Sequence, residues 1–479
     1  MKIFANRRPK RLSGVLFALS MTAAIALPRV AVSESLADAL VAAYVNSGLL
    51  EQNRAVLRAA DEDVALAVSV LKPVLRWTGD FTQQFGTVRT DANDFAPVTR
   101  SIDGLSVTAS LIAEILVYDF GSGRFAVEGT KETVLATRET LVSIEQQVLL
   151  RAVVAYFGVL RAEENLRLSQ NNVRLLSQEL QAAEDRFEVG EVTRTDVALA
   201  ESQLAAARSN LAGSQGELLQ AEEEYRNAVG QSPGTLSPPP KQPTIDSNIE
   251  AAKALALRRH PEVRAAQFQV SAAELFIRSS EADMAPRITL NGSYGYRETF
   301  NSEAYEHGGT IGVQAGQIIY QGGALSATVR RNMAQRDQRR ANLIVVSRDV
   351  AQNVGNAYAS LNSARAQIRA TEEQVRASRI AFEGVREEAK LGARTTLDVL
   401  VAEQQFLDAQ TARVDAVAQV YVAAYGVLAS TGQLTARDLG LPVQIYDPAA
   451  YYNLVKDSPA KYSKQGEKLD RVLRALQKE

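Results

Sequence analysis

Most of the sequence consists of two copies of one pattern, related by a shift of 202 positions. The shift needs no insertion over more than 110 residues, and the matching pairs include Tyr118 with Tyr320, Ala155-Tyr156 with Ala357-Tyr358, Gly190 with Gly392, and Gly230-Gln231 with Gly432-Gln433. Upstream, Pro73 matches Pro286 at a shift of 213, so the first copy is 11 residues longer in one segment. A length change confined to one segment is typical of a surface loop. We therefore expect two equivalent halves, with a longer loop in the first.

Two long spans of the chain, residues 98–232 and 287–441, contain no proline. Because proline inside a helix costs about 3 kcal/mol, such spans permit very long helices. From Gly123 to Phe187 apolar residues recur every seven positions, a spacing that predicts helix-on-helix packing; the stripe contains Val127, Val134, Leu141, Val148, Ala155, Ala162, Leu176 and Ala183. At 1.5 Å per residue this helix would span roughly 100 Å.

Each long helix is followed by a glycine, Gly190 or Gly392, where the sequence predicts a tight turn. A return helix would then run antiparallel to the first, so that helical residues cover about 123–230 in one copy and 324–431 in the other. The proline-rich residues 232–248 would link the two copies.

Strict alternation of apolar and polar residues follows Pro73 and Pro286, and this period of two predicts strands with one apolar and one polar face. Each copy thus predicts one β-hairpin, at about 74–118 and 287–320. We expect strands of roughly 10 residues, which suffices for a tilted strand to cross an outer membrane. Polar loops are expected at about 86–103 and 297–309. Candidates for an aromatic girdle are Trp77, Phe85, Tyr294 and Tyr296.

A soluble β-sandwich would show the same alternation, so this alternative remains open on the strands alone. If the strands cross a membrane, four of them cannot close a barrel, since about eight is the practical minimum. An open edge in lipid would leave backbone groups unpaired. The chain would therefore share one barrel with identical copies, and the arithmetic does not choose between a dimer of eight strands and a trimer of twelve.

The first 33 residues have the pattern of a secretory signal peptide. A basic stretch ends at Arg11, an apolar run extends from Leu12 to Leu27, and small residues occupy Ala31-Val32-Ser33. No later stretch approaches the apolar length of a membrane helix, so a second membrane crossing would have to use β-strands.

The composition excludes several classes of site. The chain has 53 basic and 55 acidic residues, and this near-zero net charge gives no global reason to bind nucleic acid. It has no cysteine and two histidines, so thiolate or multi-histidine metal centres are excluded. We expect His260 to start a helix and His307 to lie in a loop. Because no catalytic constellation is recognisable, we expect no enzyme activity, no metal and no cofactor.

The second turn carries the residues Leu391-Gly392-Ala393-Arg394-Thr395-Thr396-Leu397-Asp398-Val399-Leu400, followed by Ala402-Glu403. This stretch resembles the signature turn of the TolC family of outer-membrane efflux channels, and residues 189–197 resemble its first-repeat partner. The resemblance covers essentially the whole chain after the signal peptide. It implies an α+β membrane protein with a duplicated helix–β-hairpin–long helix–helix repeat. It also implies a homotrimer, whose 12-stranded outer-membrane β-barrel continues into a long antiparallel α-helical coiled-coil tunnel across the periplasm.

The same resemblance implies a passive exit channel of a tripartite efflux or type I secretion system. Its partners would be a periplasmic adaptor, an inner-membrane pump of the ABC or resistance-nodulation-division class, and outer-membrane lipid. The lack of a cysteine for a lipid anchor resembles the TolC and type I secretion branch more than the lipoprotein branch. The cargo stays open between small molecules and secreted proteins. A periplasmic coiled-coil adaptor and a secreted enzyme are the alternative classes.

The family closes its periplasmic end near the two turns, and this implies roles for four residues here. Carried over by position, Arg394 would bond Thr195 or Asp196 of a neighbouring helix pair. Asp398 would form an acidic ring at the constriction. Charge-assisted bonds of this kind contribute roughly 1.5–3 kcal/mol each. The alternative is that Asp196 and Asp398 only cap the return helices.

Two positions depart from the family pattern at this gate. Ala389 stands where a latch tyrosine is found in well-known members, and Val401 stands where a second lumen acid is often found. We therefore expect a weaker gate with a single acidic ring.

The predicted organisation is a signal peptide (1–33), a first repeat (34–231), a linker (232–248), a second repeat (249–433) and an equatorial tail (434–479). Within the tail, residues 462–479 predict a short amphipathic helix. We expect it to pack around the middle of the tunnel rather than to bind a membrane.

Overall fold

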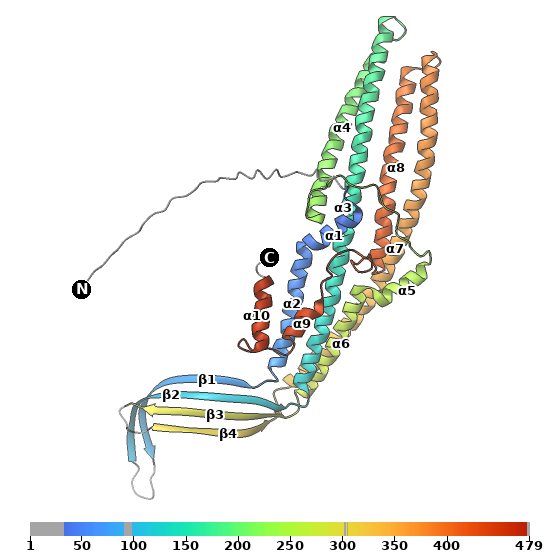
Figure 1. Ribbon diagram of the computed structural model, residues 1–479. Coiled ribbons are helices and arrows are strands. Elements are labelled where there is room, and N and C mark those ends of the chain that lie inside the picture. The colour runs from blue at the N-terminus through green and yellow to red at the C-terminus, as the bar shows by residue number, and fades with distance from the viewer. Residues whose placement is uncertain (1–32, 91–97, 301–302, 304, 477–479) are drawn as a thin grey trace, which may run out of the picture.

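The computed structural model describes residues 33–90, 98–300, 303 and 305–476 of the 479-residue chain. A long bundle of helices forms one end of the molecule, and a four-stranded sheet projects from the other end (Figure 1). The order helix, hairpin, long helix, return helix occurs twice, as the duplication predicts. The predicted signal peptide, apart from Ser33, lies outside the described residues.

The helices of the first repeat are α1 (Leu36–Asn46), α2 (Gly48–Ser69), α3 (Ser122–Glu188) and α4 (Arg194–Val229). Those of the second are α5 (Ile249–Arg259), α6 (Pro261–Ala282), α7 (Ala324–Lys390) and α8 (Thr396–Ser430), and the C-terminal segment adds α9 (Pro448–Val455) and α10 (Lys464–Leu476). His260 starts α6 as predicted, because its Nδ1 accepts a hydrogen bond from the Glu262 amide at 3.3 Å. Burial lowers the pKa of this imidazole.

The heptad stripe predicted for the first long helix is the buried side of α3. Every apolar member is buried, namely Val127, Val134, Leu141, Val148, Ala155, Ala162, Leu176 and Ala183. α3 packs against α1, α2, α4, α6 and α8, so it forms the centre of the bundle. It is also the one helix, within the part of the chain that the structure describes, that is long and apolar enough to pass a test for a membrane span. Such a stretch after the signal peptide was not expected from the sequence, and the packing of α3 among α1, α2, α4, α6 and α8 explains its apolar character.

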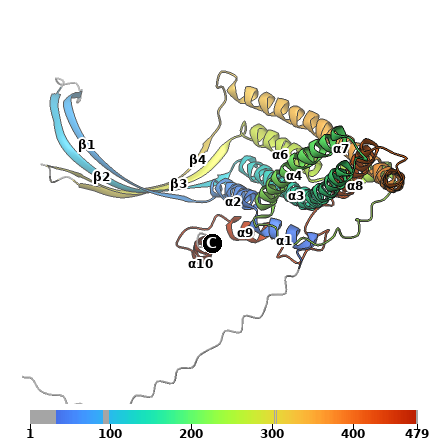
Figure 2. The ribbon, with the colours of Figure 1, turned by 90° about the horizontal axis from the view of Figure 1, so that it is seen from above.

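The two hairpins form a single antiparallel sheet in the order β1-β2-β3-β4. Its strands are β1 (Val74–Thr90), β2 (Val98–Tyr118), β3 (Arg287–Thr299) and β4 (Tyr305–Gly316). Pairing of β2 with β3 joins the two repeats, and β1 and β4 are left as the two edges. Viewed along the helices, the sheet curves as an arc away from the bundle (Figure 2).

The strands are longer than predicted. β1 and β2 have 17 and 21 residues, and β3 and β4 have 13 and 12. The extra residues of the first copy extend the paired strands. The predicted loops at 86–103 and 297–309 are therefore too long, because β1, β2, β3 and β4 each extend into them. His307 accordingly lies in β4, stacked on Tyr305. Polar residues such as Thr87 predicted a loop. The backbone of a β-hairpin can nevertheless form its hydrogen bonds where neither face of the strands is apolar.

The proline-rich linker is fixed to both repeats by equivalent tyrosines. The Tyr156 hydroxyl donates to the Ser237 carbonyl at 2.9 Å, and the Tyr358 hydroxyl donates to the Asp246 carbonyl at 2.8 Å. Tyr156 is fully buried in the main core beside α1 and α4. The linker is therefore an ordered strap across the bundle.

The C-terminal segment begins beside the middle of the bundle and continues toward the sheet. α9 packs on α2, and α10 packs on α9. The Lys72 ammonium, just before β1, donates to the Ser458 carbonyl at 3.1 Å. This contact places the loop between α9 and α10 at the base of the sheet, closer to the strands than the predicted position around the middle of the tunnel, and α10 runs from the loop back along the bundle (Figure 1).

Candidate functional site

The two turns that carry the predicted gate residues lie at the end of the bundle farthest from the sheet (Figure 1). Gly190 and Gly392 have φ of +79° and +77°, a left-handed conformation that glycine adopts without strain. In the second turn the Ala393 amide donates to the Glu388 carbonyl at 2.9 Å, and the first turn has the equivalent bond from Glu191 to Arg186. Both long helices therefore end in the same tight motif, which reverses the chain within a few residues.

Each return helix begins with a capping box, and the two boxes match at the shift of 202. Thr395 caps α8: its amide donates to Asp398 Oδ2 at 3.0 Å, and its hydroxyl accepts from the Asp398 amide at 3.2 Å. Thr193 and Asp196 make the same pair of bonds at the start of α4. The bonds from threonine hold the pKa of both carboxyl groups below the ordinary value. Both aspartates therefore do act as helix caps and are charged at neutral pH.

Arg394 is exposed and pairs within its own turn, where its Nε donates to Glu388 Oε2 at 2.8 Å. Among the described residues no hydrogen bond joins it to Thr195 or Asp196. The expected latch between helix pairs is thus a contact that would have to form between copies of the chain. Thr195 is exposed and Asp196 half-buried, so both are accessible for such a contact.

The two positions that depart from the family pattern differ in their surroundings. Ala389 is half-buried and packs in a small cluster with Phe382 and Val399. Val401 is exposed on α8. Neither can donate or accept a side-chain hydrogen bond, which agrees with a gate of fewer polar contacts.

A buried acid near these turns was missed by the sequence analysis. Glu403 on α8 is only 3% exposed, and both carboxylate oxygens lack a hydrogen-bond partner among the described residues. It faces an ion pair of 3.3 Å between Arg386 on α7 and Glu179 on α3. Burial, with Glu179 adding to it, raises the pKa of Glu403 to about 7. The local sequence contains no distinguishing signal, because Glu201 stands at the same position relative to Val197 in the first repeat and is exposed.

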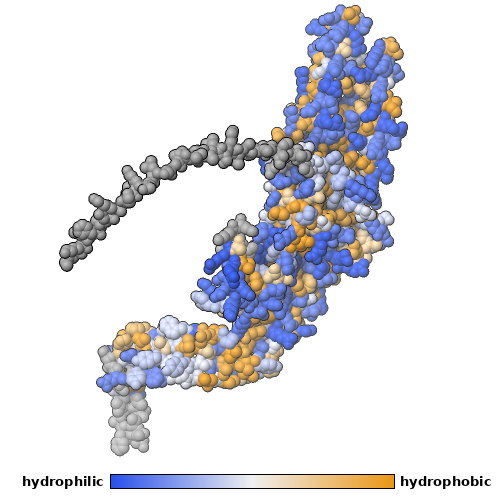
Figure 3. Space-filling view, viewed as in Figure 1, coloured by the Kyte–Doolittle hydropathy of each residue, from blue (hydrophilic) through white to orange (hydrophobic). Residues whose placement is uncertain are grey.

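The sheet has one apolar and one polar face over its whole four-stranded part. Trp77, Leu111 and Tyr294 are cross-strand neighbours on the apolar face, and Tyr296 lies in the next row. The fourth girdle candidate, Phe85, lies farther along, where only β1 and β2 pair. The apolar face is exposed in the single chain, and Figure 3 shows apolar side chains gathered over the strands.

The polar face carries hydrogen bonds across strands. Asn291 donates to Gln314 at 3.2 Å, and Ser293 and Thr310 lie 2.8 Å apart as a hydroxyl pair. Arg297 reaches Thr108 at 3.3 Å. A sheet of this kind can separate lipid on one side from water on the other.

A second aromatic group lies where the sheet joins the helices. The rings of Tyr118, at the end of β2, and Phe120 meet edge to face with centroids 4.8 Å apart. Tyr320, after the edge strand β4, is exposed. Tyr118 and Tyr320 occupy equivalent positions in the two repeats. The repeat alignment contained these tyrosines, and both lie at the base of a hairpin where the chain passes from sheet to helix.

Comparison with known proteins agrees with this architecture. The family model described as outer membrane efflux protein matches residues 39–231 and 254–433. The outer membrane efflux protein BepC of Brucella suis is 35% identical over 442 residues, which are 92% of this chain and 94% of BepC. The alkaline protease secretion protein AprF of Pseudomonas aeruginosa is 26% identical over 67% of this chain and 68% of AprF.

Solved structures show the same fold. The outer membrane protein VceC of Vibrio cholerae, at 20% identity, matches with a TM-score of 0.72 over 83% of this chain and 96% of VceC. Both matched halves of the family model contain one hairpin and one interhelical turn. The chain therefore belongs to the outer membrane efflux protein family, and it is an outer-membrane channel.

Proposed function

We propose that three copies of the chain close one 12-stranded barrel in the outer membrane. The observation that carries this proposal is the two-faced sheet with open edges at β1 and β4. In lipid each unpaired backbone group would cost several kcal/mol, so the edges need partners. Pairing β4 of one copy with β1 of the next satisfies both edges by a single repeated contact. The polar face then lines a water-filled lumen.

The helices would continue this lumen as a tunnel into the periplasm. α7 leaves Ile344 and Val345 half exposed on the surface of the single chain. Apolar side chains on a helix of 67 residues favour packing against a further helix. A neighbouring copy supplies that helix in the proposed trimer.

The gate would lie at the interhelical turns. Asp398 uses Oδ2 for both bonds from Thr395, so its second oxygen remains for other contacts. Threefold repetition would place three such carboxylates around one axis as an acidic ring. Arg394, held by Glu388 in the single chain, would exchange this partner for Thr195 or Asp196 of a neighbouring helix pair when the end closes.

The channel would be passive and would open when a periplasmic adaptor and an inner-membrane pump engage the turns. A conduit of this kind needs no catalytic group, so we propose no enzyme activity. Relatives named for efflux and for protease secretion both resemble this chain, and the pump would select the cargo. The match of the family model to both repeats argues against the alternative of an adaptor protein.

Conductance in planar bilayers tests the acidic ring. Asp398→Asn retains an oxygen for the Thr395 cap and removes the charge. We expect it to lower cation selectivity and to weaken block by multivalent cations, because the charged ring attracts cations. Asp196→Asn, which changes the equivalent cap of the first repeat, is the matched control and is expected to have a smaller effect. Unchanged selectivity in Asp398→Asn would reject the ring.

A further inference from the structure

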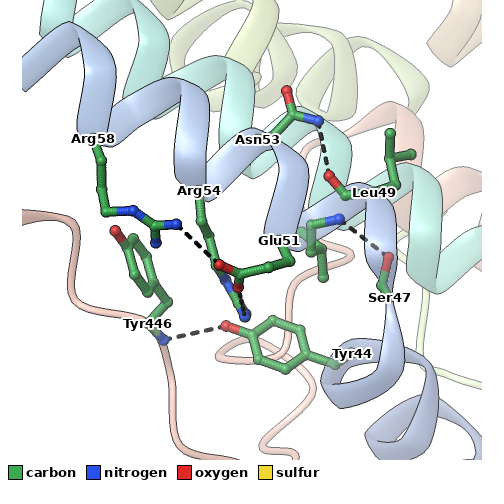
Figure 4. Close-up of polar contacts among 9 residues, drawn as sticks. Tyr44, Ser47, Leu49, Glu51, Asn53, Arg54, Arg58 and Tyr446 are labelled. Atoms are coloured by element: carbon green, nitrogen blue, oxygen red, sulfur yellow. Dashed lines mark hydrogen bonds and ion pairs between the residues drawn. The ribbon is translucent and has the colours of Figure 1, made fainter. Parts of the chain in front are cut away.

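The C-terminal segment packs along α2 through α9 and is held by contacts before and after α9. Near its start the Tyr446 amide donates to the Tyr44 hydroxyl at 3.2 Å, and Arg54 lies over both rings (Figure 4). In the loop after α9, the Lys72 ammonium donates to the Ser458 carbonyl. The part of the segment from Tyr446 to Ser458 is therefore held between the middle of the bundle and the base of the sheet, and α10 follows it and packs on α9.

The loop between α9 and α10 lies at the level where the apolar face of the sheet begins. Lys72 precedes β1 by one residue, Pro73. Leu75, the first apolar-face residue of β1, lies about 10 Å farther along the extended chain. In Figure 1 this loop is the part of the C-terminal segment nearest the strands, and α10 runs from it back along the bundle.

The exposed side of the loop and of α10 is basic. Leu469 and Leu473 pack toward α9, so the opposite side of the helix faces outward. That outward side carries four exposed basic residues at helical spacing, which we name the C-terminal basic stripe: Lys461, Lys464, Lys468 and Arg471. Glu467 and Asp470 lie on its flank and leave the stripe itself basic. Polar side chains cover this part of the surface in Figure 3.

We propose that the C-terminal basic stripe binds the anionic phospholipid headgroups of the membrane leaflet at the base of the sheet. The inference rests on the proposed function, because that function places the apolar face of the sheet in lipid. Basic residues close to an anionic membrane surface are attracted within about one Debye length, about 8–10 Å. Lys461 lies in the loop next to the base of the sheet, Lys464 begins α10, and Lys468 follows one turn later.

The loop also carries an aromatic side chain suited to the membrane interface. Tyr462 is 89% exposed, and its ring lies 5.9 Å from the Lys461 ammonium. Exposed tyrosine beside lysine is typical of the headgroup region, where the ring meets the acyl boundary and the charge meets phosphate. The stripe also continues the membrane contact of the sheet, which favours lipid over an acidic protein as its partner. Binding there would brace the bundle against the membrane.

Fluorescence quenching in vesicles tests the proposal on the full-length protein. Because the chain has no cysteine, a single Ala460→Cys in the loop accepts a polarity-sensitive probe specifically. The protein is reconstituted in phosphatidylethanolamine vesicles with or without phosphatidylglycerol, and a headgroup-labelled quencher lipid is added. We expect roughly threefold or greater quenching when phosphatidylglycerol is present. Replacement of all four stripe residues by glutamine should remove this difference.

Two reference positions separate failure of the inference from failure of the proposed function. Ile311→Cys on the apolar face of β4 reports whether the sheet is in lipid, and Leu391→Cys at the far turn should not be quenched. If position 311 is quenched and position 460 behaves like position 391, the lipid contact of the stripe is refuted. If position 311 is not quenched, the placement of the sheet in lipid fails and the inference fails with it.

Discussion

The long helices of the two repeats have the same length and the same start, but very different surroundings. α3 and α7 each have 67 residues and begin after a glycine with φ of +91° or +82°. α3 buries 21 of its residues within the chain, whereas α7 buries 8. α3 packs against four long neighbours, and α7 lies at the edge of the bundle. Equivalent sequence patterns therefore produce equivalent helices, while the neighbours decide which faces become interior.

The return helices show the same contrast at a single position. Glu201 on α4 and Glu403 on α8 are equivalent at the shift of 202, and each follows an alanine. Glu201 is exposed, whereas Glu403 is enclosed between α3 and α7. In the second repeat the glutamate is buried where α8 packs against α3 and α7. In the first repeat the equivalent glutamate remains in water.

The largest effect, loss of the trimer, is expected from substitutions on α7, the helix at the edge of the bundle. Ile344→Asp combined with Val345→Asp should abolish the trimer, because two charges would be buried at the proposed contact between copies. The mass of the detergent-solubilised protein, measured by light scattering, should fall from three chains to one. The conservative pair Ile344→Leu and Val345→Leu should keep the mass of three chains. A full trimer in the aspartate variant would place the contact elsewhere on the helices.

The next effect concerns the buried glutamate and depends on pH. The folded chain retains the Glu403 proton up to a pKa of about 7, whereas the unfolded chain loses it near 4.5. Stability attributable to this group therefore falls as pH rises from about 4.5 to about 7. Glu403→Gln should remove the penalty and stabilise the protein by about 3 kcal/mol at pH 8, with little change at pH 4.

Thermal melting followed by circular dichroism checks this pH dependence. Glu201→Gln, at the equivalent exposed position, should change stability by less than about 0.5 kcal/mol at either pH. Equal melting shifts for the two variants at pH 8 would contradict the burial of Glu403 between α3 and α7. Arg386 on α7 and Glu179 on α3, the charged groups that face Glu403, remain in both variants.

The smallest change in stability is expected at the two capping boxes, where the repeats have the same structure. Thr193→Ala and Thr395→Ala each remove one capping box, and each should cost about 1 kcal/mol. The expected result is a similar increase in proteolysis at the two interhelical turns in the solubilised protein. A much larger increase at only one turn would show that the two caps are not equivalent in the assembled channel.

Local periodic patterns made much of the fold predictable. The stripe that begins at Val127 identified the buried side of α3, and the alternative that Asp398 caps the return helix agrees with its capping box with Thr395. The alternation after Pro286 identified the two faces of the second hairpin. Each of these features depends on residues within a few turns or strands of one another, so the sequence carries it directly.

Features that depend on distant neighbours could not be predicted in this way. Nothing near Glu403 distinguishes it from Glu201, because its burial comes from α3 and α7. The polar residues near Thr87 looked like a loop, since pairing of a solvated hairpin leaves no apolar signal. The position of the C-terminal segment depends on Lys72 and the Ser458 carbonyl, a backbone contact without a sequence pattern.

The central claim is that the two faces of the sheet contact lipid and water, and labelling at adjacent positions of β4 tests it most directly. Ile311 is 87% exposed on the apolar face, and Thr310 lies on the polar face. In intact outer membranes, a membrane-impermeant maleimide should label Thr310→Cys through the lumen. It should label Ile311→Cys only after detergent is added. Equal labelling of both positions before detergent would contradict a membrane-spanning sheet.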